Sequence, residues 1–117
     1  MAAPNLLSST TVNGKTAVAS LTNSALQSIL SVTTSTLVKM NDIQVTNYSS
    51  SSITCNVVLN RSSTVYYLAG TMSVPANSAL VVIAKDSTVY FEEGDILQAN
   101  VSTNGAASLT ASYELIS

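Results

Sequence analysis

Histidine is absent from this chain of 117 residues, and cysteine occurs once, at Cys55. The lack of histidine excludes Ser-His-Asp and Cys-His catalysis and the ordinary zinc sites. A single cysteine excludes an intramolecular disulfide. Cys55 stands in an alternating segment, Ile53–Val57, and we expect a buried structural thiol because unpaired cysteine is among the most buried residue types.

Charge is scarce as well. Only 9% of the residues are charged, with a net charge of −2, whereas roughly 25% is typical of soluble domains. The four basic residues, Lys15, Lys39, Arg61 and Lys85, are too few and too scattered to neutralise a phosphate backbone, so we expect no nucleic acid partner. Interface cores are depleted in charge, and a lone monomer usually needs more of it to stay soluble. The composition therefore favours a homo-oligomer.

Long apolar runs are also missing. No apolar segment reaches the about 18 residues that indicate a membrane-spanning helix. The opening MAAPNLLSST lacks the basic residues and the long apolar core of a secretory signal. We therefore expect no membrane partner and a protein that is made in a cytoplasm and stays there or leaves by lysis.

Hydroxyl side chains and short apolar segments take the place of charge. The chain has 20 Ser and 14 Thr, and 46% of its residues are hydrophobic. Thr and Val favour strands, whereas Ser and Asn fill turns and exposed faces. Short segments separated by turn residues predict strands at Leu6–Val12, Lys15–Leu21, Leu26–Val32 (a strand or a helical turn), Leu37–Asn47, Ile53–Leu59, Thr64–Met72, Ala79–Ala84, Val89–Phe91, Ile96–Ser102 and Ala107–Leu115.

This pattern predicts an all-β fold without helices: a single β-sandwich domain over residues 1–117, jelly-roll-like, with eight to ten short strands. The two sheets are expected to close over Leu37–Val45, Ile53–Leu59, Leu80–Ile83 and Ile96–Val101.

Several turn and loop signals accompany the strands. Asn13-Gly14 and Asn104-Gly105 each predict a hairpin. An irregularity is expected at Asn41-Asp42, a loop at Ser49–Ser52, and another loop at Pro75, where no ladder hydrogen bond is lost.

The densest group of acidic residues is Glu92-Glu93-Gly94-Asp95, between Phe91 and Ile96. Calcium needs six to eight oxygen ligands, and the EF-hand spacing is absent. A catalytic carboxylate pair would need burial to raise its pKa, whereas a turn this polar is expected to face water. We therefore expect a strand-connecting turn with Gly94 at a positive φ. We expect no metal, no cofactor and no catalytic residue.

Two weaker signals stay open. A Ser-Lys dyad with Lys39 or Lys85 is conceivable, but the abundance of serine makes the signal uninformative. Tyr66 and Tyr67 should place one ring on each face of a sheet, one in the core and the other as an interface or a carbohydrate platform.

Three stretches resemble a known family: the opening MAAPN with Asn13-Gly-Lys-Thr-Ala17, the segment SVPANSALVVIAKDSTVYFEEGDILQA, and the ending SYELIS. Together they are similar to small virion structural proteins of tailed bacteriophages, especially those of marine bacteria including cyanobacteria. The middle segment also resembles a wider group of phage β-sandwich domains in which E-x-G-D closes a strand. In that pattern Glu93, Gly94 and Asp95 form the connecting turn, and the short loop at 61–63 lies where members differ.

The resemblance carries no catalytic motif, so it implies a fold and a structural role. The first hypothesis is a non-enzymatic capsid decoration or cement protein on the outer head surface, assembled in the host cytoplasm and contacting the major capsid protein. By analogy with phage accessory proteins, a trimer is the favoured homo-oligomer. The alternatives are a tail, neck or baseplate adaptor for fibre attachment, and a carbohydrate-binding module that uses Tyr66 or Tyr67.

Overall fold

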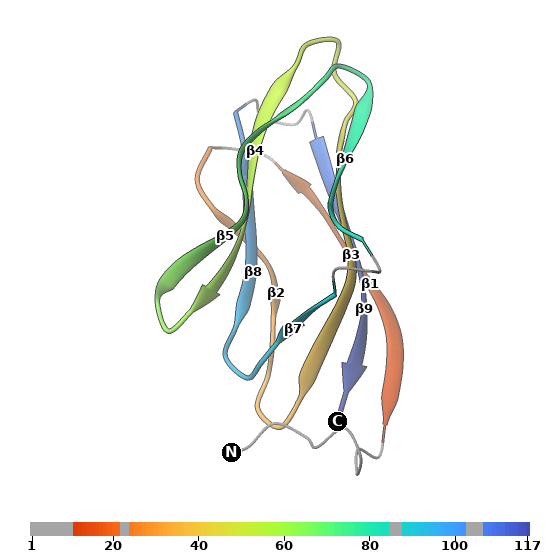
Figure 1. Cartoon of the computed structure of the whole chain (residues 1–117), viewed down its shortest axis with the longest axis vertical. Coiled ribbons are helices and arrows are strands. Elements are labelled where there is room, and N and C mark those ends of the chain that lie inside the picture. The colour runs from red at the N-terminus through yellow and green to blue at the C-terminus, as the bar shows by residue number, and fades with distance from the viewer. Residues whose placement is uncertain (1–10, 22–23, 85–87, 103–106) are drawn as a thin grey trace.

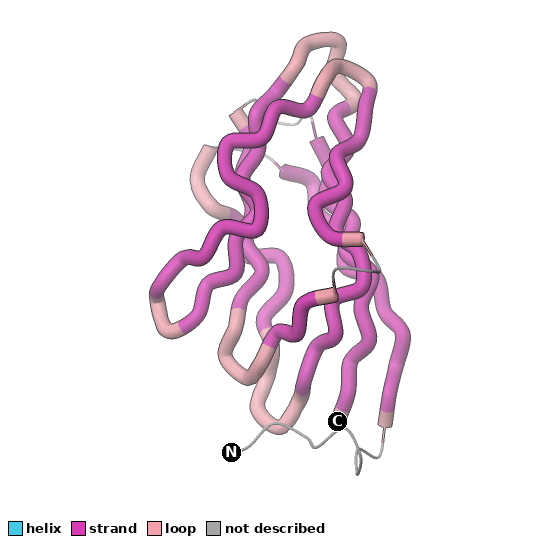
Figure 2. The backbone as a smooth tube through the Cα atoms, viewed as in Figure 1, coloured by secondary structure: helices cyan, strands magenta, loops and turns pink. Residues whose placement is uncertain are grey.

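The computed structural model describes residues 11–21, 24–84, 88–102 and 107–117, and every regular element in these ranges is a β-strand (Figures 1 and 2). Nine strands are present among them: β1 Val12–Leu21, β2 Gln27–Ser31, β3 Leu37–Asn47, β4 Ile53–Arg61, β5 Thr64–Val74, β6 Ser78–Ile83, β7 Val89–Phe91, β8 Ile96–Val101 and β9 Ala107–Ile116. The described part of the chain holds no helix that is long and apolar enough to span a membrane.

The chain is folded back on itself as a long antiparallel ribbon. Its closed end is the β4–β5 hairpin, and from there β3 pairs with β6 and β7, β2 with β8, and β1 with β9. The ribbon winds into two sheets, β1-β9-β3-β6, with β7 also paired to β3, and β2-β8-β4-β5. A ribbon wound into two facing sheets is a jelly roll. The predicted all-β sandwich is therefore confirmed.

The core lies between the two sheets and is built by alternation. Cys55 and Val57 of β4 and Leu97 and Ala99 of β8 are fully buried and face the other sheet, and Cys55 is a free thiol. All four segments over which the sheets were expected to close contribute to this core. The prediction of a buried cysteine is confirmed.

Strand β3 keeps one face toward the core along its length, although its buried residues change from even to odd positions. Val38 and Met40 are buried at even positions, and Ile43 and Val45 are buried at odd positions. The register with β9 shifts between Met40 and Asp42, which supplies the extra residue that this change requires. The irregularity predicted at Asn41-Asp42 is confirmed.

The two hairpin predictions are not confirmed. Asn13 and Gly14 lie inside β1, where they pair with Leu115 and Glu114 of β9, so the predicted turn is wrong. The ten-residue ladder to β9 outweighs the local turn preference of the Asn-Gly pair. Asn104-Gly105 lies outside the described residues, and the strands β8 and β9 that flank it belong to different sheets.

The ends of the sandwich are tied by hydrogen bonds. The loop at 49–52 and the turn at Pro75 occur where predicted, and the buried Asn47 joins them, because its Nδ2 donates to Ser51 O at 2.8 Å and to Pro75 O at 3.1 Å. At the opposite end, Thr11 and Ser117 exchange two backbone hydrogen bonds of 3.0 and 2.9 Å, next to the start of β1 and the end of β9 (Figure 1).

Candidate functional site

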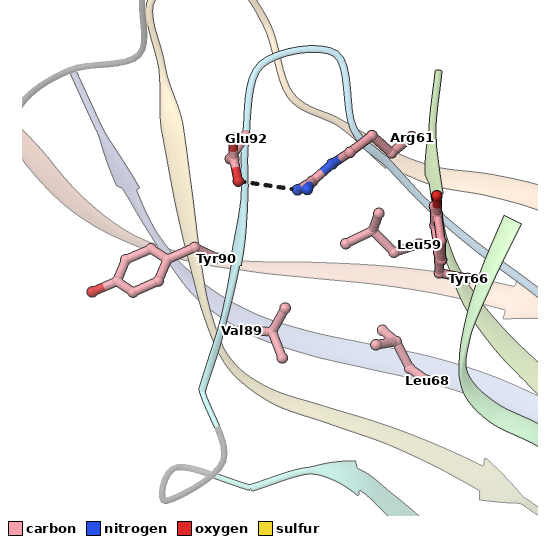
Figure 3. Close-up of a pocket in the computed structure, with 7 residues that line it drawn as sticks. All are labelled: Leu59, Arg61, Tyr66, Leu68, Val89, Tyr90 and Glu92. Atoms are coloured by element: carbon pink, nitrogen blue, oxygen red, sulfur yellow. Dashed lines mark ion pairs between the residues drawn. The ribbon is translucent and has the colours of Figure 1, made fainter. Parts of the chain in front are cut away.

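One side of the sandwich is open between strand β5, the last strand of its sheet, and strand β7 of the other sheet. A groove of about 500 Å³ lies there (Figure 3). Its lining comes from β4, β5 and the β7 region and comprises Leu59, Arg61, Tyr66, Leu68, Val89, Tyr90 and Glu92.

The floor of the groove is apolar. Leu59 is buried, and Leu68 and Val89 are half-buried against the core. Figure 3 shows the side chains of Leu68 and Val89 turned toward one another across the groove, whereas the ring of Tyr90 points away from it. The groove can therefore take up apolar groups from a partner, because it offers partly exposed hydrocarbon at its base.

An ion-pair cluster closes one end of the groove. Arg61 at the end of β4 donates from Nε to Asp95 Oδ1 at 2.8 Å and from Nη2 to Asp95 Oδ2 at 2.6 Å. The same Nη2 lies 3.3 Å from Glu92 Oε2 (Figure 3). The Asp95 side chain is only 1% exposed, whereas those of Arg61 and Glu92 are 44% and 61% exposed. A two-point pair of this kind fixes both groups, since the guanidinium fork matches the carboxylate.

The hydrogen bond to Asp95 raises the pKa of Arg61, and the charges of Asp95 and Glu92 raise it further. Arg61 therefore stays charged, and its charge is largely neutralised by two carboxylates of the same chain. Arg61 therefore offers the groove hydrogen-bond donors in a fixed position, whereas its positive charge is already largely offset.

The acidic segment forms the turn that was predicted, but its exposure to water differs from the expectation. Strand β7 ends at Phe91 and β8 begins at Ile96, Asp95 N donates to Glu92 O at 3.0 Å, and Gly94 has a φ of 84°. The expectation that the whole turn faces water is wrong, because Asp95 is buried under Arg61. The two residues are 34 positions apart, so no local pattern could have paired them.

The turn is also bound to the loop that follows β2. Val32 N donates to Asp95 O at 2.9 Å, Gly94 N donates to Val32 O at 3.0 Å, and Ser35 N donates to a carboxylate oxygen of Glu93. These contacts hold the acidic turn in place from a second side. The carboxylates of Glu93 and Asp95 are thus engaged with groups of the protein itself.

The described residues contain no group of three or more His, Cys, Asp or Glu side chains placed to hold a metal ion. Of the two lysines considered for a Ser-Lys dyad, Lys85 lies outside the described residues. Lys39 lies in β3 opposite Tyr90 of β7 and Glu114 of β9.

Tyr66 and Tyr67 lie on opposite sides of β5, as predicted. Tyr66 lines the groove and is 55% exposed, whereas Tyr67 pairs with Val58 on the outer side of the sheet and is 64% exposed. The expectation that one ring is in the core is wrong. Among the described residues β5 is the edge strand, so no strand of its sheet continues beyond Tyr66.

No model of a known protein family matches the chain, and no curated protein matches it. Its role must therefore be argued from the fold and from what its surface can bind. The groove can bury an apolar side chain next to the exposed Tyr66 and the hydrogen-bond donors of Arg61.

Proposed function

We propose that the protein is a non-enzymatic structural component of a tailed-phage virion, a decoration protein on the outer head surface that contacts the major capsid protein. The observation that carries this proposal is that a chain with only 9% charged residues exposes large apolar side chains on both sheets. These are Val12, Val18, Leu26, Tyr48, Tyr66, Tyr67, Met72, Val81 and Tyr90.

These side chains lie on more than one side of the domain, as expected of a protein that contacts several neighbours. Val12 and Val18 lie on β1, at one edge of the sandwich, and Tyr66 and Tyr90 lie at the open edge on the opposite side. Contacts on more than one side allow a small domain to join adjacent capsid subunits. A modest affinity at each contact is sufficient, because the lattice holds many copies at high effective concentration.

The fold supports the same role by analogy, since jelly rolls recur in viral capsid domains. A fold does not determine a function, so the exposed surface carries more of the argument. The resemblance of the sequence to phage virion proteins agrees with both.

The test is the number of copies per particle, measured by quantitative mass spectrometry of purified virions against the major capsid protein. A decoration protein should be present at about one copy per one to a few capsid subunits. A yield of only a few copies per particle would contradict the head location and favour a tail, neck or baseplate adaptor. Absence from the particle would overturn the virion role itself.

We further propose that the protein forms a homo-oligomer, with a trimer favoured. The basis is the scarcity of charge together with the exposed Val12 and Val18 on the edge strand β1. Multi-angle light scattering at high concentration should give a mass that is a multiple of the chain's own. A stable monomer there would contradict self-association in solution.

A further inference from the structure

The outer face of the β2-β8-β4-β5 sheet is uncharged and rich in amide side chains. The side chains of β4 and β8 alternate, so those that do not enter the core point outward. The outward positions of the middle strands are Thr54, Asn56, Val58 and Asn60 of β4 and Ile96, Gln98 and Asn100 of β8.

A first line of hydrogen bonds crosses three strands of this face. Asn60 Nδ2 donates to Gln98 Oε1 at 3.1 Å, and Gln98 Nε2 donates to Ser28 Oγ of β2 at 3.1 Å. Each primary amide carries two N–H donors and a carbonyl with two lone pairs, so each keeps further hydrogen-bonding capacity. The line holds the two amides while leaving them able to bind another group.

A second line crosses the same face one step along the strands. Asn56 Nδ2 donates to Asn100 Oδ1 at 2.9 Å, and Asn100 Nδ2 donates to Ser24 O at 2.8 Å. Asn56 Oδ1 accepts from Thr71 N at 2.7 Å, at a point of β5 where Thr71 has a positive φ of 48°. The irregular part of β5 is thereby fixed to the amides of the neighbouring strands.

On β4 a buried valine, Val58, lies between Asn56 of one line and Asn60 of the other, and it pairs with a tyrosine of β5. Val58 lies opposite Gln98 on one side and Tyr67 on the other, and it is fully buried although it points away from the core. The Tyr67 ring stays 64% exposed. It lies close to the backbone of Gly70, where an added Cβ would come 3.5 Å from Tyr67 Cδ2.

We propose that this face binds a neutral glycan, with the ring of Tyr67 stacked on the apolar face of a sugar and the amides bonded to its hydroxyls. The residues that would bind the hydroxyls are Asn56, Asn60, Gln98 and Asn100.

The chemistry of the face selects this class of ligand. A sugar hydroxyl both donates and accepts hydrogen bonds, and an amide can accept from it or donate to it without carrying charge. The two lines of hydrogen bonds already orient the amides, so less side-chain freedom is lost when a ligand binds. A carboxylate or sulfate would have to leave water without meeting a cation on this face, which is unfavourable. Glycan binding is a function in addition to the proposed role in the virion.

The experiment is affinity electrophoresis of the full chain in native gels that contain one polysaccharide each. The probes are a neutral glucan, a neutral galactomannan and, as the charged comparison, alginate. We expect retardation by at least one neutral probe, no retardation by alginate, and the same result at low and high salt because no ion pair contributes.

Three variants locate the binding surface. Tyr67→Ala should weaken binding by about tenfold or more, as loss of a central aromatic contact commonly does, and Tyr67→Phe should retain binding because the ring remains. Tyr66→Ala is the matched control: the same change one residue earlier, on the groove side of β5. It should leave binding within about twofold, because surface residues outside the contact contribute little.

Thermal melting of each variant shows whether the fold is kept, which we expect because both rings are largely exposed. Asn60→Ala should weaken binding in the same gel, which tests the amides independently of the ring. Failure of both neutral probes to retard the protein would overturn the proposal. So would binding of alginate alone, or loss of binding in Tyr66→Ala with full binding in Tyr67→Ala.

Discussion

At Asp95 one buried carboxylate accepts hydrogen bonds from three groups on two separate parts of the chain. Arg61 supplies two of them from the end of β4, and the backbone N–H of Glu92 supplies the third at 2.8 Å. These bonds join the end of β4 to the turn between β7 and β8. The residue therefore fixes the end of the groove as well as the local fold.

We expect Asp95→Asn to lower the free energy of unfolding by about 2 kcal/mol, because charge-assisted hydrogen bonds to a buried group are lost. Urea denaturation measures the change. Glu92→Gln is the matched control, with the same carboxylate-to-amide change on a partner of the same Arg61. Since the Glu92 side chain is 61% exposed, its loss should cost no more than about 0.5 kcal/mol. Equal losses in both variants would contradict a special role for Asp95.

The pH behaviour of the cluster follows from the raised pKa of Arg61. A group whose pKa is higher in the folded state contributes stability that is fully present below its unfolded pKa. That contribution is lost only as the pH rises through the folded pKa, which lies above the ordinary value of an arginine. Arg61 therefore keeps its charge wherever the domain is folded.

At the scale of single elements, two glycines in open surroundings have opposite conformational roles. Gly14 lies within strand β1 and Gly94 lies in the β7–β8 turn at a φ of 84°, and a Cβ added at either would meet no atom within 4 Å. Steric crowding is therefore absent at both positions. A substitution tests backbone conformation alone.

Gly14→Ala should raise the free energy of unfolding by about 0.5 kcal/mol, because glycine weakens a strand. Gly94→Ala should lower it by about 1 kcal/mol, because a side chain disfavours the left-handed region. Thermal or urea unfolding of the two variants provides the comparison. A loss at Gly14 as large as that at Gly94 would mean that Asn13-Gly14 forms a turn after all.

The strands were predictable because their signal is local. The alternation of inward and outward residues in β4 and β8 can be read from any few neighbouring positions, and it placed Cys55 correctly in the core. Asn13-Gly14 shows the limit of local signals. Whether this pair forms a turn or part of a strand depends on its pairing with β9, which is distant in the sequence.

The site was less predictable than the fold because its residues meet only through the topology. Arg61 reaches Asp95 because β4 and β8 are adjacent strands of one sheet, and that pairing cannot be read from the sequence. Tyr66 stays exposed because β5 is an edge strand, although its position in the alternation is an inward one. The order of strands in a sheet therefore has to be known before such a groove can be found.

At the scale of the whole molecule, Cys55 reports on global stability. Its side chain is fully buried at the centre of the sandwich, and burial raises the pKa of the thiol. A thiolate is the reactive form, so the native protein protects the sulfur twice, by exclusion of reagent and by a lack of ionisation.

We expect Cys55 to react with a thiol reagent only when the sandwich opens, at a rate that follows the unfolding equilibrium as urea is added. Rapid labelling of the native protein would contradict this, and the urea-unfolded chain provides the control. Because the folded pKa is the higher one, stability should be retained below the unfolded thiol's value of about 8.5 and should fall as the pH rises above it. Chemical denaturation across the alkaline range measures that fall, and Cys55→Ala should reduce it.

The hydrogen bonds between Thr11 and Ser117 have a mechanical consequence. They place the start of β1 beside the end of β9, in an antiparallel pair, so a pull on these two points acts across the strands. The ladder bonds lie along the direction of such a pull and are loaded one pair at a time, as in a zipper. Tension transmitted through both ends would thus peel β1 away from β9 at low force. Load applied across the faces of the sandwich would instead be shared by many bonds, so the domain is better suited to bear force through its surfaces than through its ends.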